Sequence, residues 1–451
     1  MAKLVVLRNA TPDTPSQDDE VERGTIPVEA TCTCGAPVTV RSEAGGYCGD
    51  CFYRSSLDYL RRPVRPSVAR LGDPRYVPAM RFETIAVHAG SHIDEATGAI
   101  ASPIYLSTTF ERGAEGDTPR GFSYIRDGNP TQVQLEEALA AIDGGEAALA
   151  FASGMAAGSA LLQSLPAGSH VVFPNDSYYA LRMLAADFFS KWNLTYEIVA
   201  MENLDAIRAA IRPQTKVVWV ETPSNPLMRI VDIAAVAELA HDHGAQVVVD
   251  GTFATPALQR PIEHGADVVL HSTTKYLGGH SDVQGGSLAF RSRDVLFDAI
   301  QNARVLTGGV ASPFNSWLVL RGILSLAARM RVHSENAGML AVFLSGHDKV
   351  EAVYYPGLQT HPCHEIARKQ MSEFGGMLSF LVRGGREEAL RVASRTRLFT
   401  RATSLGGVES LIEHRASSEG PASRTPQNLL RVSVGIESAD DLMEDLQSAL
   451  S

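Results

Sequence analysis

The stretch HSTTKYLGGH, residues 271–280, places a single lysine, Lys275, among small hydroxyl and glycine residues. It follows the apolar run DVVL at 267–270, so Lys275 comes just after a segment that the pattern predicts to be a buried strand. Most lysines lie on solvated surfaces. Burial and nearby positive charge lower the pKa of an amine and make it a nucleophile that forms an imine with an aldehyde. Lys275 is therefore a candidate for covalent catalysis.

The aldehyde that proteins use most widely in this way is pyridoxal phosphate (PLP). This cofactor also needs a carboxylate at its pyridine nitrogen, an anion site for its phosphate and an aromatic ring to stack on. Asp250 ends the apolar run VVVD and provides a carboxylate. In ASGMAAG, 152–158, the backbone N–H groups of Gly154 and Met155 open a predicted helix, where an anion is favoured.

Other residues complete this set. Ser272 and Thr274 add hydroxyl donors for the phosphate, and Tyr178 in NDSYYALRM is the candidate for stacking on the ring. Arg431 in LLRVSVGIE is a candidate bidentate clamp for a substrate carboxylate. Each residue alone has an ordinary alternative, such as a surface lysine, a helix cap or a surface ion pair. Their common position at element boundaries is what favours PLP chemistry.

The surrounding elements explain why such boundaries meet. The runs at 216–221, 245–250 and 266–272 are short, β-branched and apolar on both faces, which is typical of parallel strands covered by helices. Helical spacing appears at 133–142 and at 234–244, the latter stopping at Gly244. Alternating strands and helices predict an α/β domain, whose sites lie at the carboxyl ends of the strands. The last hundred or so residues mix strands and helices and predict a smaller α+β domain.

Four of the five cysteines crowd into a short segment near the N-terminus. The pairs CTC and CGDC, with glycines beside them, predict a tetrahedral structural zinc site formed by Cys32, Cys34, Cys48 and Cys51. A reduced cluster without metal and a redox pair remain as alternatives. Cys363 stands apart and is expected to be a packed, inert thiol.

From about residue 82 to 450, the chain resembles the PLP enzymes of cysteine and methionine metabolism: cystathionine γ-synthase, cystathionine γ-lyase and methionine γ-lyase. The resemblance runs through VHAGSHIDEATGAIASPIYLSTTF, SYIRDGNPT, FASGMAAG, ETPSNP, VVVDGTFATP, GADVVLHSTTKYLGGHSDVQGG, SLGGVESLI and LLRVSVGIE. It implies the aspartate-aminotransferase-like (fold type I) PLP fold. The expected organisation is a flexible acidic tail (1–27), a zinc module (28–66), an arm that reaches the neighbouring subunit's site (67–127), a large PLP-binding domain (128–326) and a C-terminal domain (327–451).

The resemblance also implies roles for single residues. The catalytic residues would be Lys275, which binds the PLP aldehyde, Asp250, which pairs with the pyridine nitrogen, and Tyr178, which stacks on the ring. The phosphate would be held by Gly154, Met155, Ser272 and Thr274, and, from the neighbouring subunit, by Tyr124 and Arg126. Ser404 and Arg431 would position the substrate α-carboxylate, and Asn225, also a candidate for substrate binding, would contact that carboxylate or the phenolic oxygen of PLP.

Departures from the family pattern leave the substrate open. Thr403 replaces the glutamate of many cystathionine enzymes, and Ala180 replaces the cysteine of methionine γ-lyases. The usual DNTF is DGTF, with Gly251; RGILSL at 321–326 and EHRASSEG at 413–420 are also unusual. We expect γ-elimination or γ-replacement on a sulfur-containing or homoserine-derived amino acid, with a non-standard substrate. A β-lyase acting on cysteine or a cysteine conjugate, and a non-catalytic binding protein on this scaffold, are the alternatives.

The composition and the family resemblance limit the binding partners that we expect for this protein. A formal charge of −11 disfavours nucleic acid and anionic membranes, and no apolar run of spanning length or signal pattern is evident, so a cytoplasmic enzyme is expected. The family implies a homotetramer, a dimer of dimers with shared active sites. The zinc module faintly resembles that of tRNA 2-thiolation proteins and is expected either to dock a sulfur carrier or acyl-carrier protein, or to extend the oligomer interface.

Overall fold

The computed structural model describes residues 80–420 and 423–451, together with two short strands, 40–42 and 45–47. The chain divides into two units, Met1–Val64 and Arg65–Ser451. In the first unit, β1 (Val40–Ser42) and β2 (Gly45–Tyr47) form an antiparallel pair with Val40 opposite Tyr47. The proposed zinc ligands Cys32, Cys34, Cys48 and Cys51 lie outside the described residues.

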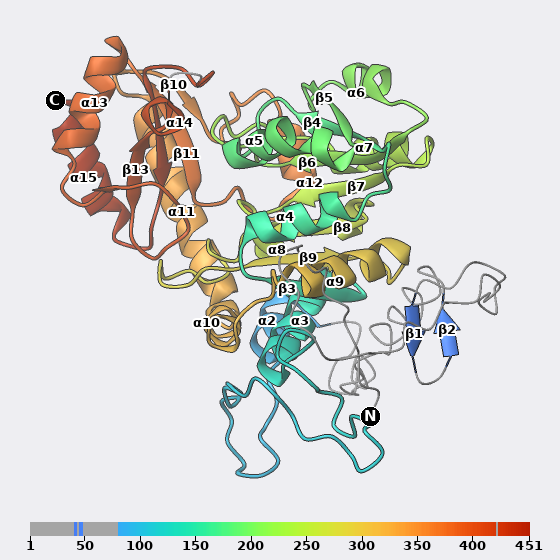
Figure 1. Cartoon of the computed structure of the whole chain (residues 1–451). Coiled ribbons are helices and arrows are strands. Elements are labelled where there is room, and N and C mark those ends of the chain that lie inside the picture. Colours follow the sequence, from blue (N-terminus) through green and yellow to red (C-terminus); the bar gives the residue numbers. More distant parts are fainter. Residues whose placement is uncertain (1–39, 43–44, 48–79, 421–422) are drawn as a thin grey trace, which may run out of the picture. The chain divides into compact units, whose positions relative to one another are not determined.

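The second unit is built on a seven-stranded sheet in the order β3-β9-β8-β7-β6-β4-β5 (Figure 1). The strands are β3 (Ala147–Phe151), β4 (His170–Pro174), β5 (Thr195–Val199), β6 (Thr215–Glu221), β7 (Gln246–Asp250), β8 (Val268–His271) and β9 (Gly286–Phe290). The three apolar runs singled out in the sequence are β6, β7 and β8. Strands β4 to β8 pair in parallel, as expected, but β9 is antiparallel to both of its neighbours. The sheet is therefore mixed.

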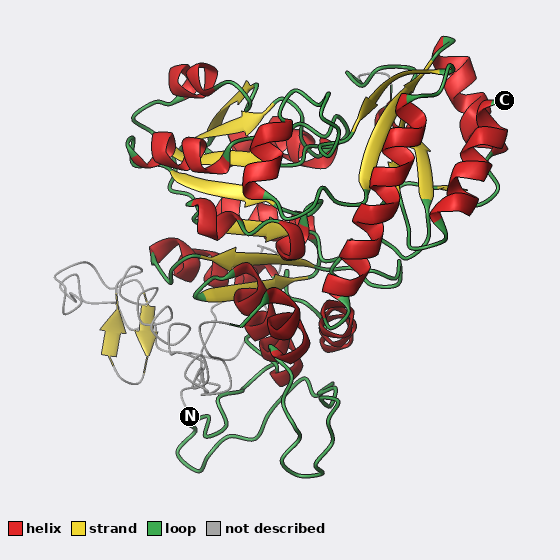
Figure 2. Ribbon diagram, turned by 180° about the vertical axis from the view of Figure 1, so that it is seen from behind, coloured by secondary structure: helices red, strands yellow, loops and turns green. Residues whose placement is uncertain are grey.

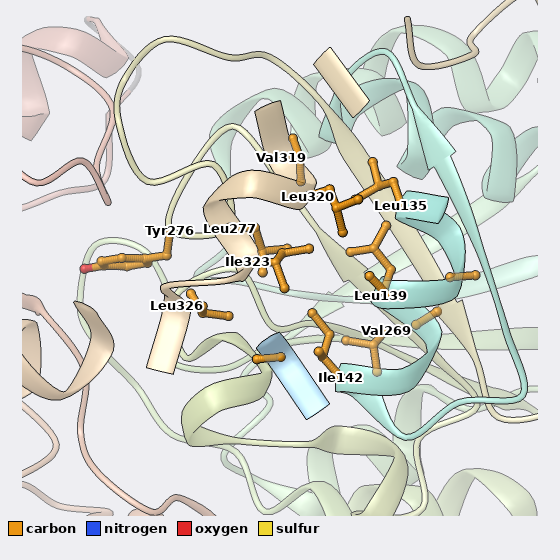
Figure 3. Close-up of a cluster of buried hydrophobic side chains, with 14 of the residues drawn as sticks. Leu135, Leu139, Ile142, Val269, Tyr276, Leu277, Val319, Leu320, Ile323 and Leu326 are labelled. Carbon is orange, nitrogen blue, oxygen red and sulfur yellow. The ribbon is translucent and has the colours of Figure 1, made fainter. Parts of the chain in front are cut away.

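Helices cover both faces of this sheet, because successive strand side chains point to opposite sides. Leu149, Phe151, Trp219 and Leu270 pack with the helices of one face. These are α4 (Gly154–Gln163), α5 (Tyr179–Phe188) and α9 (Val295–Thr307). The other face carries α3 (Pro130–Asp143), α6 (Leu204–Ala210), α7 (Ile233–His241) and α10 (Pro313–Ile323). Figure 3 shows side chains of α3 and α10 meeting over Val269 of β8.

The predicted helices form with small changes at their ends. Helix α3 begins earlier than the apolar spacing indicated, because Pro130 is its first residue and the Asn129 side chain accepts a hydrogen bond from Thr131 N at 2.9 Å. Helix α7 ends at His241 rather than at Gly244. Gly244 instead forms the turn that follows, with a left-handed φ of 71°.

The C-terminal part forms a second, smaller sheet (Figure 2). Its strand order is β10-β11-β14-β13-β12, and only β12 and β13 pair in parallel. Its strands are β10 (Val350–Tyr354), β11 (Met377–Val382), β12 (Thr400–Arg401), β13 (Leu411–His414) and β14 (Leu429–Ser433). The apolar faces of α11 (Leu326–Ser345), α13 (Gly385–Arg395) and α15 (Ala439–Leu450) pack on it. The smaller α+β domain expected from the sequence is present.

Shorter elements complete the second unit: α2 (Phe82–His88), η1 (Phe189–Trp192), α8 (Thr255–Leu258), η2 (Pro261–His264), α12 (His364–Gln370) and α14 (Arg415–Glu419). Residues 89–129 run between α2 and α3 without a named helix or strand. This segment exposes apolar side chains, with Ile100 85% and Leu106 66% exposed. Among the described residues, no helix is both long and apolar enough to cross a bilayer.

Candidate active site

Lys275 lies four residues beyond the end of β8, in a loop that its own backbone holds together. Lys275 N donates to Ser272 O at 3.1 Å, and Gly279 N donates to Lys275 O at 2.8 Å. The Arg329 guanidinium donates to Tyr276 O at 2.8 Å. The loop is also tightly packed, since a Cβ added to Gly406 would lie 2.6 Å from Tyr276 N. The backbone around Lys275 is thus fixed by both the large sheet and the C-terminal part.

The Lys275 amine points to Ser404. Its Nζ donates to Ser404 Oγ at 2.6 Å. Ser404 has a φ of 83°, in the left-handed region that non-glycine residues seldom adopt. A strained backbone at such a point is typical of functional sites, where the surroundings hold it in place.

The electrostatics of the site suit a reactive amine. Burial, followed by the positive charge of Arg431, lowers the pKa of Lys275 to about 8, while Glu413 opposes the shift. A sizeable fraction of the side chain is therefore the neutral amine near neutral pH. Neutral amine is the form that attacks an aldehyde or accepts a proton.

The start of α4 and the loop after β8 come together as an anion cradle. A Cβ added to Gly154 would lie 3.0 Å from Ser272 Cβ, and one added to Gly286 would lie 2.5 Å from Gly154 N. Glycine is thus required at both positions for the helix start to approach the Ser272 hydroxyl. Ser153 caps this helix by accepting from Ala156 N at 3.0 Å. Backbone N–H groups at a helix N-terminus beside a hydroxyl are suited to a phosphate.

Thr274 lies beside this cradle but is partly engaged elsewhere. Its hydroxyl donates to Gly285 O and accepts from Gly285 N, both at 3.1 Å. By contrast, the Ser272 hydroxyl makes no hydrogen bond within the part of the chain that is described, whereas the Ser272 backbone is bonded through N to Thr252 Oγ1 at 2.9 Å and through O to Lys275 N at 3.1 Å. Ser272 is the better placed of the two to donate to an anion.

Two carboxyl groups end adjacent strands next to the lysine. Glu221 of β6 is opposite Asp250 of β7. Burial raises the pKa of Asp250, although hydrogen bonds from Thr252, including Thr252 N to Oδ1 at 3.0 Å, oppose this. Burial and then the charge of Asp250 raise the pKa of Glu221 well above its usual range. The shift favours the protonated form of Glu221, which also accepts a hydrogen bond from Tyr178 N at 2.7 Å.

A buried histidine lies next to Asp250. His271 Nε2 is 2.9 Å from Asp143 Oδ1, and both residues are almost fully buried. Burial alone would lower the pKa of His271, but the Asp143 carboxylate reverses this and the net shift is upward. The electrostatic interaction with His271 opposes the rise in the Asp250 pKa.

A guanidinium lies on the opposite side of Ser404. Arg431 is 3% exposed; its Nη1 donates to Asn225 Oδ1 at 3.0 Å and its Nη2 to Ser404 O at 2.9 Å. Arg431 also forms an ion pair with Glu413, which faces it across β13 and β14. Burial lowers the pKa of Arg431 to about 10, which leaves it charged at neutral pH. Asn225, Ser404 and Arg431, the three predicted substrate-positioning residues, are thus brought together.

The predicted aromatic and arm residues are placed at the surface. Tyr178 is 45% exposed and directly precedes α5. Tyr124 is 44% exposed, and the Arg126 guanidinium lies 5.6 Å from its ring centroid. Arg126 Nη1 donates to Val305 O at 2.8 Å. The reach of Tyr124 and Arg126 into a neighbouring subunit remains a prediction.

Three further groups at this site were missed by sequence reasoning: the Asp143–His271 pair, Glu413 and Arg415. Asp143 and His271 are far apart in sequence, and nothing in the sequence shows that they pair. Glu413 could be found only once the register of β13 against β14 was known. Arg415 stands in EHRASSEG, which was noted only as an unusual motif. Cys363 is half-buried, and burial raises the pKa of its thiol, as expected for an inert cysteine.

The residues present fit PLP. The glycine-lined cradle would hold a phosphate, Asp250 is a buried carboxyl group at the end of the strand adjacent to β8, and Lys275 is an amine with a lowered pKa. The described residues contain no group of three or more His, Cys, Asp or Glu placed to hold a metal ion.

Comparison with known proteins gives consistent matches. The family model described as Cys/Met metabolism PLP-dependent enzyme matches residues 83–451. Cystathionine gamma-synthase of Mycobacterium tuberculosis is 50% identical over 375 residues, covering 81% of this chain and 96% of the relative. Cystathionine beta-lyase of Lactococcus lactis subsp. cremoris is 43% identical over 380 residues, covering 82% and 98%. The crystal structure of metB from Corynebacterium glutamicum matches with a TM-score of 0.81 and 43% identity, covering 83% of this chain and 99% of that chain.

Proposed function

Because the chain belongs to the Cys/Met metabolism PLP-dependent enzyme family, we propose that it catalyses γ-replacement on a homoserine-derived amino acid, with a thiol as acceptor. In this reaction the thiol loses its proton and its sulfur bonds to Cγ, while the bond between Cγ and its oxygen breaks and a carboxylate or a phosphate leaves with that oxygen. With cysteine as the thiol, the product is cystathionine. Without a thiol, the leaving group is eliminated and hydrolysis by water gives 2-oxobutyrate and ammonia.

The observation that carries the proposal is the link between Lys275 and Arg431 through Ser404. Lys275 Nζ bonds the Ser404 side chain at 2.6 Å, and Arg431 bonds the Ser404 carbonyl at 2.9 Å. An amino acid whose carboxylate binds Arg431 would therefore present its Cα to the lysine amine. The similarity to the cystathionine γ-synthases, extending over 96% of their length, supports the assignment of the γ-position.

PLP, when bound, withdraws electrons from the substrate Cα, so that protons at Cα and then at Cβ become acidic. In the proposed site Gly154, Met155, Ser272 and Thr274 would hold its phosphate. Asp250 would accept a hydrogen bond from its pyridine nitrogen, and Tyr178 would stack on its ring. Lys275 Nζ would bind its aldehyde.

With an amino-acid substrate in the site, the Lys275 Nζ would be the group that moves protons. A pKa of about 8 is close to the working pH, so the amine can both accept a proton from Cα and return one further along the side chain. Arg431 and Asn225 fix the carboxylate meanwhile. Glu413 must release part of the Arg431 guanidinium for this to happen.

A second candidate is β-elimination from cystathionine, favoured by the 43% identity to cystathionine β-lyases. The test is a product assay on the purified full chain with PLP. With O-acyl or O-phospho homoserine plus cysteine, γ-replacement gives cystathionine. With cystathionine, β-elimination gives pyruvate, ammonia and homocysteine, whereas γ-elimination gives 2-oxobutyrate, ammonia and cysteine. If the enzyme forms pyruvate from cystathionine faster than it synthesises cystathionine, β-elimination is its main activity and the γ-replacement proposal is wrong.

We further propose that the enzyme works in the cytoplasm as a homotetramer, a dimer of dimers. Exposed apolar side chains in 89–129, including Ile100 and Leu106, support the burial of this segment against another subunit. Tyr124 and Arg126 would reach the phosphate of the neighbouring site from there. Mixing inactive Lys275→Ala and Tyr124→Phe/Arg126→Ala chains should restore activity if sites are shared, because one hybrid site then has both intact sets.

For the N-terminal unit we propose a structural Zn²⁺ site formed by Cys32, Cys34, Cys48 and Cys51. The spacing of two close cysteine pairs supports it. The unit would dock a sulfur carrier or an acyl-carrier protein, with the basic segment YLRRPVRPSVAR facing an acidic partner. Deleting residues 1–66 should abolish capture of such a carrier while turnover of a free amino acid continues.

A further inference from the structure

Arg415 is a second buried arginine close to the proposed carboxylate clamp. It directly follows His414, the last residue of β13, and is the first residue of the short helix α14. Its side chain is 7% exposed, and its ion-pair partners are Glu413 and Glu419. Glu413 also pairs with Arg431. The Glu413 carboxylate therefore lies between two guanidinium groups. Arg431 would bind the substrate carboxylate, whereas Arg415 has no role in the proposed reaction.

The contacts of Arg415 leave its hydrogen-bonding capacity largely unused. Arg415 Nη1 is 3.4 and 3.5 Å from the two Glu413 oxygens, and its Nε is 3.4 Å from Glu419 Oε1. Strong bonds between a guanidinium and a carboxylate are 2.7–2.9 Å long. Arg415 Nε is also buried without a hydrogen-bond partner among the described residues. A guanidinium has five N–H donors, so Arg415 can still bind an anion.

Both carboxylates that flank Arg415 are already satisfied by other groups. Glu419 Oε2 accepts hydrogen bonds from Ser423 Oγ at 2.7 Å and Thr425 Oγ1 at 2.9 Å. Glu413 Oε2 accepts the much closer bond from Arg431. Neither carboxylate depends on Arg415 for its main bond. Holding these two groups is thus a weak explanation for a buried guanidinium, whose desolvation is costly.

The positive charge of Arg415 influences the Lys275 amine. It is among the groups that lower the pKa of Lys275, after burial and Arg431. The path of contacts from Arg415 through Glu413 and Arg431 to Ser404 ends at Lys275 Nζ. A substrate bound by Arg431 and Lys275 would therefore have its side chain within the field of Arg415.

We propose that Arg415 forms a second anion-binding position, which selects amino acids carrying a negatively charged group at the far end of the side chain. The chemical class is an α-amino acid with a distal carboxylate or phosphate. This inference rests on the proposed function, and it names the residue that sets substrate choice at the same site. Arg415 binds the distal anion in place of its long contacts to Glu413 and Glu419.

The test is a binding titration of the PLP-loaded full chain with three amino acids of matched length: L-2-aminoadipate, L-2-amino-5-phosphonopentanoate and L-norleucine. They carry a distal carboxylate, phosphonate and methyl group, and the absorbance change of the bound cofactor gives each Kd. The wild type should bind at least one anionic ligand about ten- to hundredfold more tightly than norleucine, the range expected for a charged hydrogen-bonded pair. Which anion wins distinguishes a carboxylate from a phosphate substrate.

Arg415→Gln should remove this preference, so that the variant still binds norleucine but binds all three ligands with similar Kd values. Glu419→Gln should leave the preference intact or increase it, because a competing carboxylate is lost. Arg386→Gln is the matched control, since Arg386 is an exposed arginine that bonds Ser417 of the same short helix at 3.3 Å; it should behave like the wild type.

Equal Kd values for the three ligands in the wild type would overturn the proposal even if the variant failed to fold. So would a loss of norleucine binding in both Arg415→Gln and Glu419→Gln, since that is the result of a purely structural ion pair. The titration does not depend on turnover. An enzyme that binds the anionic ligands selectively but converts no homoserine derivative would refute the proposed function and leave this inference standing.

Discussion

Glu221 and Asp250 are opposite each other at the ends of two neighbouring parallel strands, and only one of these carboxyl groups can be charged at modest cost. Thr252 donates hydrogen bonds to Asp250, and these and His271 oppose the rise in the Asp250 pKa, whereas Glu221 accepts a bond from the backbone of Tyr178. The pKa of Glu221 is raised well above its usual range, so this arrangement favours the charge on Asp250 and the proton on Glu221. It gives each carboxyl group a separate task at the site.

Glu221→Gln is therefore expected to be well tolerated, since a neutral amide replaces a neutral acid and its oxygen can still accept from Tyr178 N. Glu221→Ala should lower kcat/KM about tenfold, because Tyr178 loses the bond that fixes its backbone. Steady-state kinetics on the two variants make the comparison. A Glu221→Gln enzyme as impaired as Glu221→Ala would mean that the residue works as a carboxylate.

The same raised pKa predicts a pH effect on stability. A carboxyl group whose pKa is higher in the folded than in the unfolded protein binds an extra proton on folding, so stability falls as the pH rises from the unfolded value of about 4.5 towards the folded one. Glu221→Gln removes this loss. Its Tm relative to the wild type should increase between pH 5 and pH 8 in thermal melts; a constant difference would argue against the raised pKa.

Lys275→Ala should abolish the absorbance band of covalently held PLP and reduce turnover about 10³-fold, since both covalent attachment and proton transfer are lost. The rate at which PLP-free wild type rebinds the cofactor covalently should rise with pH around a midpoint of about 8, because the free amine is the attacking form. In Arg431→Gln this midpoint should move upwards, since a positive charge that disfavours the ammonium ion is removed. A midpoint that stays in place would show that Arg431 does not influence the amine.

Gly154→Ala should weaken PLP binding about tenfold or more, because the new Cβ would lie 3.0 Å from Ser272 Cβ and push the cradle apart. Gly158→Ala on the same helix is the matched control. Its Cβ would meet its nearest neighbour, Trp219, at 3.5 Å, an ordinary contact. Dialysis against buffer without PLP, followed by measurement of the retained cofactor, should distinguish the two variants. Equal retention would mean that the start of α4 does not bind the phosphate of PLP.

Purified full-length chain is expected to carry one zinc ion per protomer, and Cys48→Ser/Cys51→Ser should lose it. Because these residues lie in a different unit from Lys275, turnover of a small amino-acid substrate should change less than twofold. Elemental analysis and steady-state assays check the two parts. A chain that binds zinc equally well after the double substitution has its metal elsewhere.

The sequence was informative where chemistry depends on local spacing. Lys275, Asp250, and Gly154 beside Ser272 stand at strand and helix ends that apolar runs reveal, and the structure brings them together. The features that the sequence did not predict depend on pairing between residues far apart in the chain. The antiparallel direction of β9 and the Glu413–Arg431 register arise from how the chain returns, which no local pattern records. Asp143 and His271, likewise, are 128 residues apart and pair only in the fold.

The hydrogen bond between Lys275 and Ser404 spans 129 residues of chain. During translation the lysine thus emerges from the ribosome long before the serine and arginine that complete its surroundings. A nascent or prematurely terminated polypeptide lacking the last strands would have the lysine, but neither the Arg431 guanidinium that helps to lower the pKa of its amine nor a clamp for an amino acid. Competence to consume metabolites is thereby postponed until synthesis is almost finished.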